Sequence, residues 1–233
     1  MVYVISDLHG YPLVLFKKLL RSAGFSKEDR LYIIGDVVDR NGDGGIRMLQ
    51  WIMEQPNVRL LLGNHESMLL SCDFLFYEDT DMILMDLDAG QTDRLSIYMW
   101  NGGDVTARAL RTLTSGERLD IYEYLKKCPL YENVSVGDQN FILVHSGFSN
   151  FSVNRRLSDY TSDELLWSRP SLSDRYFEDK ITVFGHTPTK YYGENYRGQI
   201  IRTKTWIDID VGAGSGEKPV LLRLDDDEEF RPD

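Results

Sequence analysis

The sequence predicts an α/β protein built on two β-sheets, with helices on their outer faces. Two observations predict it. Short apolar runs alternate with amphipathic helical patterns over the first 70 residues, which is typical of parallel strands joined by helical crossovers. After residue 129 the apolar runs follow one another closely, which indicates a second sheet.

The first unit is predicted to be β-α-β-α-β. Its strands are expected at residues 2–6, 31–35 and 58–62. Pro12 opens an amphipathic helical pattern, a second helix is expected from about Gly45 to Glu54, and a third opens near His65. Units of this kind form parallel, right-handed sheets.

Residues from about 73 to 127 change to aromatic and acidic residues in helical order, and we expect a helical insert in a single domain spanning residues 1–233. It is expected to pack beside the site and partly roof it. Asp104 is expected to cap a helix there. An aromatic stripe at this spacing is more often core than binding surface. The stripe comprises Phe74, Leu75, Phe76, Tyr77, Met82, Leu84, Met85, Tyr98 and Trp100.

The last hundred residues return to strands. Residues 130–136 and 140–144 flank a Gly-Asp pair and predict a hairpin, and residues 149–180 are expected to be irregular. Further strands are expected at 181–185, 199–202, 206–211 and 220–224, the last three as an antiparallel set. The acidic run at 225–229 is expected to be a solvated tail.

Composition narrows the class of protein. The chain has 233 residues, 42% of them hydrophobic, and a net charge of -11, which argues against nucleic-acid and anionic-membrane binding. No apolar run is long enough to span a bilayer, so a cytoplasmic protein is expected. Cys72 and Cys128 lack the spacing of a metal or disulfide motif and are expected to be reduced and buried.

Five predicted strands end in polar side chains, and the ligand-binding crevice of α/β sheets lies at that edge. The chain has only four histidines, and all four lie at these ends. The residues are Asp7 and His9, Asp36, Asn64 and His65, His145, and His186.

These side chains are the ligands of a predicted two-metal centre. Oxygen and imidazole ligands without cysteine suit Mn first, with Fe or Zn as alternatives. Six ligands are too many for one tetrahedral ion, and Asp36 is predicted to bridge two divalent or trivalent ions. A water between the ions would serve as nucleophile toward phosphorus. The six ligands are Asp7, His9, Asp36, Asn64, His145 and His186.

Four further roles complete the predicted chemistry. His65 adjoins a ligand and is the candidate general acid, with Asp39 expected to orient it and raise its pKa. Arg40 and Arg169 are expected to hold phosphoryl oxygens, so that the site is positive within an acidic protein. Singly, each residue could be a helix cap, a core histidine or a surface ion pair. Together, at five strand ends, they favour an active site.

The motifs resemble the phosphoprotein phosphatase family of calcineurin-like metallophosphoesterases, and the short bacterial and phage serine/threonine phosphatases in particular. The resemblance covers residues 2 to about 224. Its motifs are Ser-Asp7-Leu-His9-Gly, Gly35-Asp36-Val-Val-Asp39-Arg40, Gly63-Asn64-His65-Glu66, Val-His145-Ser-Gly, Gly-His186-Thr, Trp100-Asn-Gly-Gly103 with Thr106, Pro129-Leu-Tyr131, Leu166-Trp167-Ser-Arg169 and Ile207-Asp208. Ser6, Asn41 and Ser146 depart from the usual pattern and leave the ligands intact.

The resemblance implies a four-layer α/β/β/α sandwich of two mixed sheets with a two-metal site. Asp7, His9 and Asp36 would bind one metal. Asp36, Asn64, His145 and His186 would bind the other. The implied acid pair is His65 with Asp39, and Arg40, Arg169 and Asn64 would hold phosphate.

Three functions remain open from the sequence. The first is a phosphomonoesterase acting on phosphoserine and phosphothreonine in proteins or peptides, by direct attack of a hydroxide that bridges the two metals. The second is hydrolysis of a dinucleoside polyphosphate such as diadenosine tetraphosphate, since a related branch uses the same ligands. The third is a non-catalytic phosphoprotein-binding module, which has no need of a general acid.

Overall fold

The computed structural model describes residues 1–77 and 86–232 and contains the two predicted sheets. The first sheet has the order β10-β9-β1-β2-β3, in which β1, β2 and β3 are parallel and β9 and β10 antiparallel. The predicted β-α-β-α-β unit is therefore confirmed. The strands of the first sheet are β1 (Val2–Ile5), β2 (Arg30–Ile33), β3 (Val58–Leu60), β9 (Leu221–Arg223) and β10 (Glu228–Phe230).

The second sheet has the order β4-β5-β6-β8-β7 and is also mixed. β4 and β5 form the predicted hairpin, β5, β6 and β8 run parallel, and β7 is antiparallel to β8. The strands are β4 (Tyr131–Val136), β5 (Gln139–Val144), β6 (Ile181–Phe184), β7 (Ile201–Arg202) and β8 (Trp206–Asp208).

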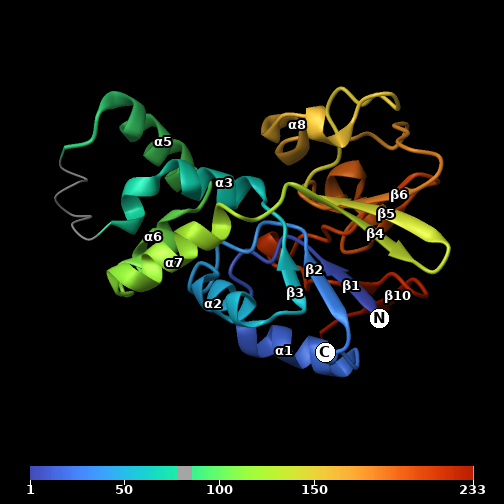
Figure 1. Cartoon of the computed structure of the whole chain (residues 1–233), viewed down its shortest axis with the longest axis horizontal. Helices are drawn as coiled ribbons and strands as arrows, with labels where there is room; N and C mark the ends of the chain where they lie inside the picture. Colours follow the sequence, from blue (N-terminus) through green and yellow to red (C-terminus); the bar gives the residue numbers. More distant parts are fainter. Residues whose placement is uncertain (78–85, 233) are drawn as a thin grey trace.

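The two sheets face each other, with helices on the outside (Figure 1). Alternation along β1 shows how the layers are specified. Tyr3 and Ile5 pack into the core shared with the outer helices, whereas Val4 packs into the core between the sheets. Helices α1 (Leu13–Ser22) and α2 (Ile46–Glu54) cover the first sheet with the apolar faces predicted for them. The predicted four-layer arrangement of two mixed sheets is confirmed.

Residues 73–127, here called the helical segment, follow α3 (Asn64–Ser71) and form no strand in their described part. Asp104 is the first residue of α6 and Gly103 precedes it as the cap, so the expected cap was one residue off. Trp100, expected in the core, is 91% exposed, and Met82, Leu84 and Met85 lie outside the described residues. The elements are η1 (Asp73–Phe76), α5 (Ala89–Trp100), α6 (Asp104–Leu110) and α7 (Ser115–Leu125).

Three other expectations about the later chain were wrong. Residues 149–180 contain η2 (Leu157–Asp159) and α8 (Ser162–Leu166), which Thr161 caps by accepting from the backbone N–H of Glu164. The last strands are not one antiparallel set, because β9 crosses to the first sheet and pairs with β1. The acidic end is no solvated tail, since β10 pairs with β9 and Arg223 bonds Asp226. Arginine side chains pair with the acidic residues, and the charge of the sequence run does not by itself indicate this pairing.

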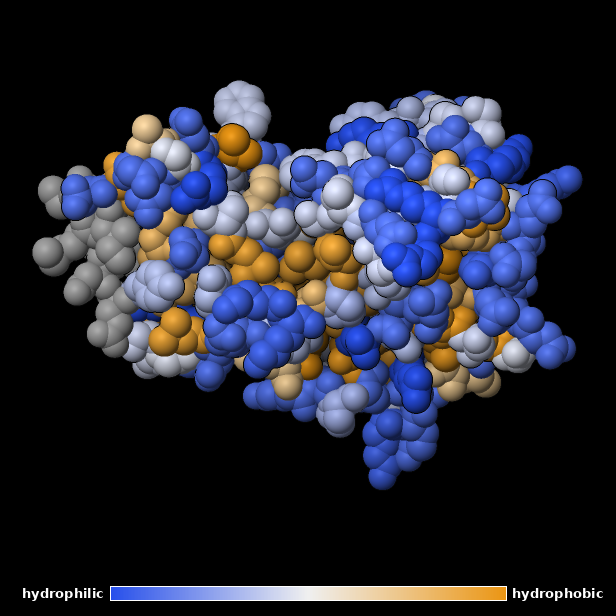
Figure 2. All heavy atoms as spheres, turned by 45° about the horizontal axis from the view of Figure 1, so that its top comes forward, coloured by the Kyte–Doolittle hydropathy of each residue, from blue (hydrophilic) through white to orange (hydrophobic). Residues whose placement is uncertain are grey.

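The surface is hydrophilic over much of one face. Hydrophilic residues cover much of the face in Figure 2, with apolar atoms visible in a band between the part over α5 and the part over α8. Cys72 and Cys128 are both free thiols, and Cys128 is only partly buried. Within the described residues, no helix combines the length and the apolar character that crossing a bilayer requires.

Candidate active site

The loops after β1 and β2 are held together by backbone hydrogen bonds. The N–H groups of Asp7 and His9 donate to the carbonyls of Gly35 and Asp36 (3.1 and 2.9 Å). Asp7, His9 and Asp36 all have positive φ values, between 41° and 55°. Such values are uncommon away from glycine and persist where surrounding contacts enforce them. These contacts bring three candidate ligands to one edge of the sheet.

Glu66, quoted in the sequence motif but given no role there, fastens the Asp36 loop to α3. Its carboxylate is fully buried and accepts the backbone N–H groups of Gly63, Asp36, Val37 and Val38 at 2.7 to 3.1 Å. Gly63 has no room for a side chain, because a Cβ atom there would lie 2.3 Å from Asp36 Oδ1. Glu66 thus fixes the backbone that presents Asp36.

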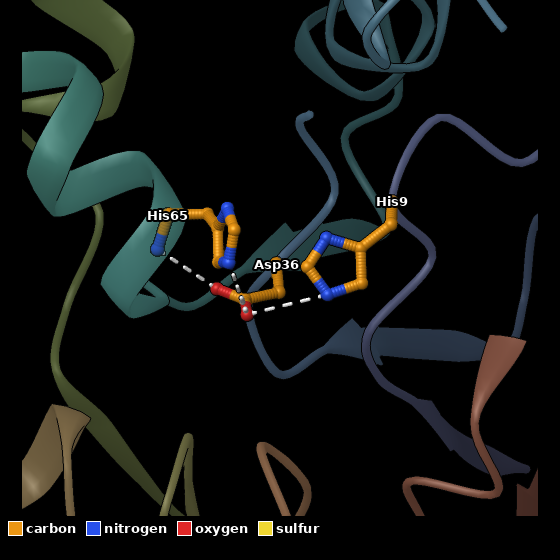
Figure 3. Close-up of side chains that lie close together, drawn as sticks. All are labelled: His9, Asp36 and His65. Atoms are coloured by element: carbon orange, nitrogen blue, oxygen red, sulfur yellow. Dashed lines mark hydrogen bonds and ion pairs between the residues drawn. The ribbon is translucent and has the colours of Figure 1, made fainter. Parts of the chain in front are cut away.

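Asp36 lies between two groups of histidines. His9 Nε2 is 3.5 Å from Asp36 Oδ2, and His65 Nε2 is 3.9 Å from the same oxygen. Figure 3 shows both rings directed toward the carboxylate. On the other side, His145 Nε2 is 3.4 Å from Oδ1, and His186 completes a second group with Asp36 and His145. Each group places its ligand atoms within 4.8 Å of one another.

The second sheet supplies His145 after β5 and His186 after β6. His145 Nε2 and His186 Nδ1 each lie 2.9 Å from the amide oxygen of Asn64. The backbone N–H of His186 donates to Asp7 Oδ2 (3.0 Å), which ties the two sheets together at the site. The structure therefore brings together all six predicted ligands.

The donor set fits a cation. His145 Nδ1 donates to the carbonyl of Ile34 (2.9 Å), and His9 Nδ1 donates to that of Val38 (3.0 Å). With Nδ1 bonded in this way, each ring turns Nε2 toward Asp36, and His145 turns it toward the Asn64 oxygen as well, which is the orientation of a metal ligand. Acceptors facing acceptors in a buried site lack a positive partner, and metal ions supply one. The residues present fit metal binding.

The electrostatics of the site agree with that fit. Burial, with the nearby carboxylates of Asp7 and Glu66, raises the pKa of Asp36 well above its usual value. Burial also lowers the pKa of His9 well below its usual value, and lowers that of His186 to about 2, with nearby positive groups adding to both shifts. His9 and His186 are thus neutral, which is the form that binds metals.

His65 and Asp39 form the predicted pair, but the expected pKa shift of His65 was wrong. His65 Nδ1 lies 2.7 Å from Asp39 Oδ2, and Arg40 donates to Nε2 (3.0 Å), so the neutral ring carries its proton on Nδ1. Burial, followed by the charge of Arg40, lowers the pKa of His65 to about 2. Burial also raises the pKa of Asp39 to about 7. Desolvation outweighs the attraction between the two partners.

Arg169 stands apart from this cluster. It is exposed beside a cavity of about 820 Å³ that Thr187 and Tyr191 also line, and its charge helps to lower the pKa of His186. Arg40, by contrast, contacts the cluster through its side chain, and its backbone N–H donates to the carbonyl of Gly102 in the helical segment (3.0 Å).

Besides Glu66, three further residues near the site were not assigned from the sequence. Tyr98 and Thr106 of the helical segment bond Asp39, and Asp210 is a buried acid whose pKa is raised by burial and by Asp7. Tyr98 occurs at a spacing that indicates core, so the sequence carried no signal for its hydroxyl. Thr106 was only noted in a motif, and Asp210 follows β8 as the other acids follow their strands.

Comparisons with known proteins show what the chain is similar to. The family model described as calcineurin-like phosphoesterase matches residues 1–208. The chain is 26% identical to the symmetrical bis(5'-nucleosyl)-tetraphosphatase of Haemophilus ducreyi, over 81% of this chain and 59% of that protein. It is 23% identical to serine/threonine-protein phosphatase 1 of Salmonella typhimurium, over 96% of this chain and 91% of that protein.

Solved structures share the fold. A protein serine/threonine phosphatase from Saccharomyces cerevisiae matches with a TM-score of 0.56 at 15% identity, covering 98% of this chain and 79% of that one. A structure provisionally described as a diadenosine tetraphosphatase matches with a TM-score of 0.65 at 18% identity, covering 99% and 91%.

Proposed function

The chain belongs to the calcineurin-like phosphoesterase family, and from that premise we propose that it is a metal-dependent phosphomonoesterase acting on phosphoserine and phosphothreonine in proteins. One observation carries the proposal. The His65–Asp39 pair, with Arg40 on the same imidazole, lies at Asp36, which is shared by two groups of possible metal-ligand atoms, one with His9 and His65 and the other with His145 and His186. This arrangement combines a proton donor, a phosphate-binding cation and a metal centre.

The proposed metal ligands are those that the structure brings together. Two bound ions, Mn first and Fe or Zn as alternatives, would activate a water and draw charge from the phosphoryl oxygens. One site would use Asp7, His9 and Asp36, and the other Asp36, Asn64, His145 and His186.

His65 would need a second proton, on Nε2, before it could act as an acid. In the structure, Arg40 occupies Nε2 by donating to it, and burial together with the Arg40 charge keeps the ring neutral. A bound phosphate dianion would draw the Arg40 guanidinium to its own oxygens and free Nε2. The negative phosphate would also favour the imidazolium, which could then protonate the departing oxygen.

The chemistry of the leaving group favours a serine or threonine phosphate. A departing alkoxide is strongly basic and needs a proton, whereas a nucleotide phosphate leaves as a stable anion. A positioned acid is thus of greater use on a phosphomonoester. The match to the Salmonella phosphatase over nearly the whole of both chains supports the same substrate.

A second candidate is hydrolysis of diadenosine tetraphosphate. It is supported by the Haemophilus tetraphosphatase and by an Acidovorax protein of the same description, which is 28% identical over 71% of this chain. This chain spans 59% and 47% of the lengths of those two relatives.

The test compares the two substrates. Chelator-stripped protein is assayed with and without Mn on a phosphoserine peptide and on diadenosine tetraphosphate. We expect Mn to restore turnover of the peptide, and His65→Asn to lower its kcat by about 10²- to 10⁴-fold. The loss on the anhydride should be far smaller. Asp29→Asn, far from the site, is the control.

Other outcomes would contradict the proposal. Faster turnover of diadenosine tetraphosphate, with equal losses from His65→Asn on both substrates, would favour the second candidate. Phosphate release from neither substrate with Mn, Fe or Zn would favour a binding module.

A further inference from the structure

Two hydroxyl groups from the helical segment meet the Asp39 carboxylate. Tyr98 of α5 and Thr106 of α6 each donate to Asp39 Oδ1 at 2.7 Å, opposite the oxygen that faces His65. Asp39, Tyr98 and Thr106 are fully buried. The carboxylate is thus held from both sides, by the imidazole on one oxygen and by two hydroxyls on the other.

The two hydroxyls differ in what else they bond. Thr106 Oγ1 accepts the backbone N–H of Asp39 (3.0 Å) and can give its one proton to Asp39 or to the carbonyl of Gly44 (3.0 Å). Tyr98 donates to Asp39, and burial, followed by the charge of Asp39, raises the pKa of Tyr98 well above its usual value. Tyr98 is therefore the dedicated donor, and Thr106 also fixes the backbone of Asp39.

The position of Tyr98 is enforced by its surroundings. A Cβ atom on Gly103 would lie 2.4 Å from the Tyr98 ring, so glycine is required for the ring to pack there. The adjacent Gly102 carbonyl accepts the backbone N–H of Arg40. The turn at Gly102 and Gly103 thus contacts both Arg40 and Tyr98.

We propose that Tyr98 and Thr106 are positioning residues that hold the Asp39 carboxylate in the plane in which it keeps the His65 proton on Nδ1. This inference rests on the proposed function. With Nδ1–H fixed, the second proton of the imidazolium is on Nε2, and it passes to the ester oxygen as the P–O bond breaks. His65 is left neutral with its Nδ1–H still on Asp39. Without the hydroxyls the carboxyl group can rotate, and the imidazole can adopt the wrong tautomer.

The kinetic test uses two leaving groups. Tyr98→Phe and Thr106→Val are compared with wild type on a phosphoserine peptide and on p-nitrophenyl phosphate, whose leaving group departs without a proton. We expect each variant to lose about tenfold in kcat on the peptide, as partners of reacting groups typically do, and less than about twofold on the aryl ester. Tyr3→Phe, which removes another buried hydroxyl bonded to the Ala23 carbonyl (2.9 Å), is the matched control.

The second readout is independent of activity. The chain has four histidines, so ¹⁵N spectra of its imidazoles can be assigned with His65→Asn. In the structure Arg40 also favours the Nδ1–H tautomer by donating to Nε2, so the tautomer is compared in an Arg40→Ala background. We expect His65 to hold its proton on Nδ1 in Arg40→Ala and to become a mixture of tautomers in Arg40→Ala with Tyr98→Phe. An unchanged tautomer, or equal kinetic losses on both esters, would overturn the inference. Failure of the proposed function shows separately, as absence of phosphate release by wild type.

Discussion

The two ends of β2 carry aspartates in opposite circumstances. Asp29, before the strand, accepts hydrogen bonds from the Met1 ammonium (2.7 Å) and from the N–H and hydroxyl of Ser26 (2.8 Å each). Burial alone would raise its pKa, but these donors prevail and lower it. Asp36, after the strand, has its pKa raised well above the usual value by burial and by neighbouring carboxylates.

The asparagines around β3 repeat the contrast. Asn57, before the strand, donates to the carbonyls of Ser26 and Asp29 (3.1 and 2.9 Å). Asn64, after it, directs its amide oxygen at nitrogens of His145 and His186. The amino ends of these strands satisfy their polar groups, while the carboxyl ends gather acceptors that need a cation. In this sheet, the polar groups at the amino ends of the strands stabilise the fold. Those at the carboxyl ends form the candidate active site and lower the free energy of unfolding.

Among the substitutions at the carboxyl ends of the strands, Asp36→Asn should have the largest effect on turnover. We expect a loss of turnover of about 10³-fold or more, because losing a ligand shared by two metals exceeds the roughly 10- to 100-fold effect of outer-shell partners. In metal-free protein the same change should stabilise. The change removes a carboxyl group whose pKa the site raises, and the new amide offers N–H groups to the lone pairs that face it. We expect the free energy of unfolding, measured with denaturant, to rise by about 1 kcal/mol.

Asp29→Asn is the matched control, because it is the same substitution at the other end of the same strand. It should keep turnover and lower the free energy of unfolding. If Asp36→Asn destabilised the metal-free protein as Asp29→Asn does, the contrast between the two ends would be lost.

Glu66→Gln should have the next largest effect. The amide places N–H donors against the backbone N–H groups that the carboxylate now accepts. We expect a loss of about 3 kcal/mol in unfolding free energy and about 10- to 100-fold weaker metal binding. Chemical denaturation and Mn titration measure the two effects. Unchanged Mn affinity would show that the Asp36 loop keeps its conformation without Glu66.

The carboxyl edge was predictable from sequence because each ligand directly follows an apolar run, and parallel strands end together. A helical insert was predicted at about residues 73–127, but the contacts of its side chains were not, because Tyr98 and Trp100 share a helical pattern that indicates core for both. One is fully buried with its hydroxyl on Asp39, and the other is 91% exposed. Local periodicity shows which face is apolar and does not show which hydroxyl reaches a distant carboxylate.

The acidic C-terminal run illustrates another limit of sequence reasoning. A strand partner and arginines on neighbouring strands decide whether such a run is a tail. Here β9 pairs with β1 at the first sheet, and residues 228–230 extend that sheet. The pKa of His65 was mispredicted for a related reason, because its burial and the nearby charge of Arg40 arise only in the folded chain.

The smallest expected effect tests the amino edge through pH. The pKa of Asp29 is lower in the folded chain than in the unfolded chain, so its stabilisation is present above the unfolded pKa and is lost as pH falls through the folded pKa. Wild type should therefore exceed Asp29→Asn by about 1 kcal/mol at neutral pH. The gap should narrow below the ordinary aspartate pKa of about 4. Denaturant unfolding of both proteins across this range measures it. A gap that stays constant with pH would mean that Asp29 stabilises the fold without its charge, and that the amino edge does not differ from the carboxyl edge in the way its carboxylates ionise.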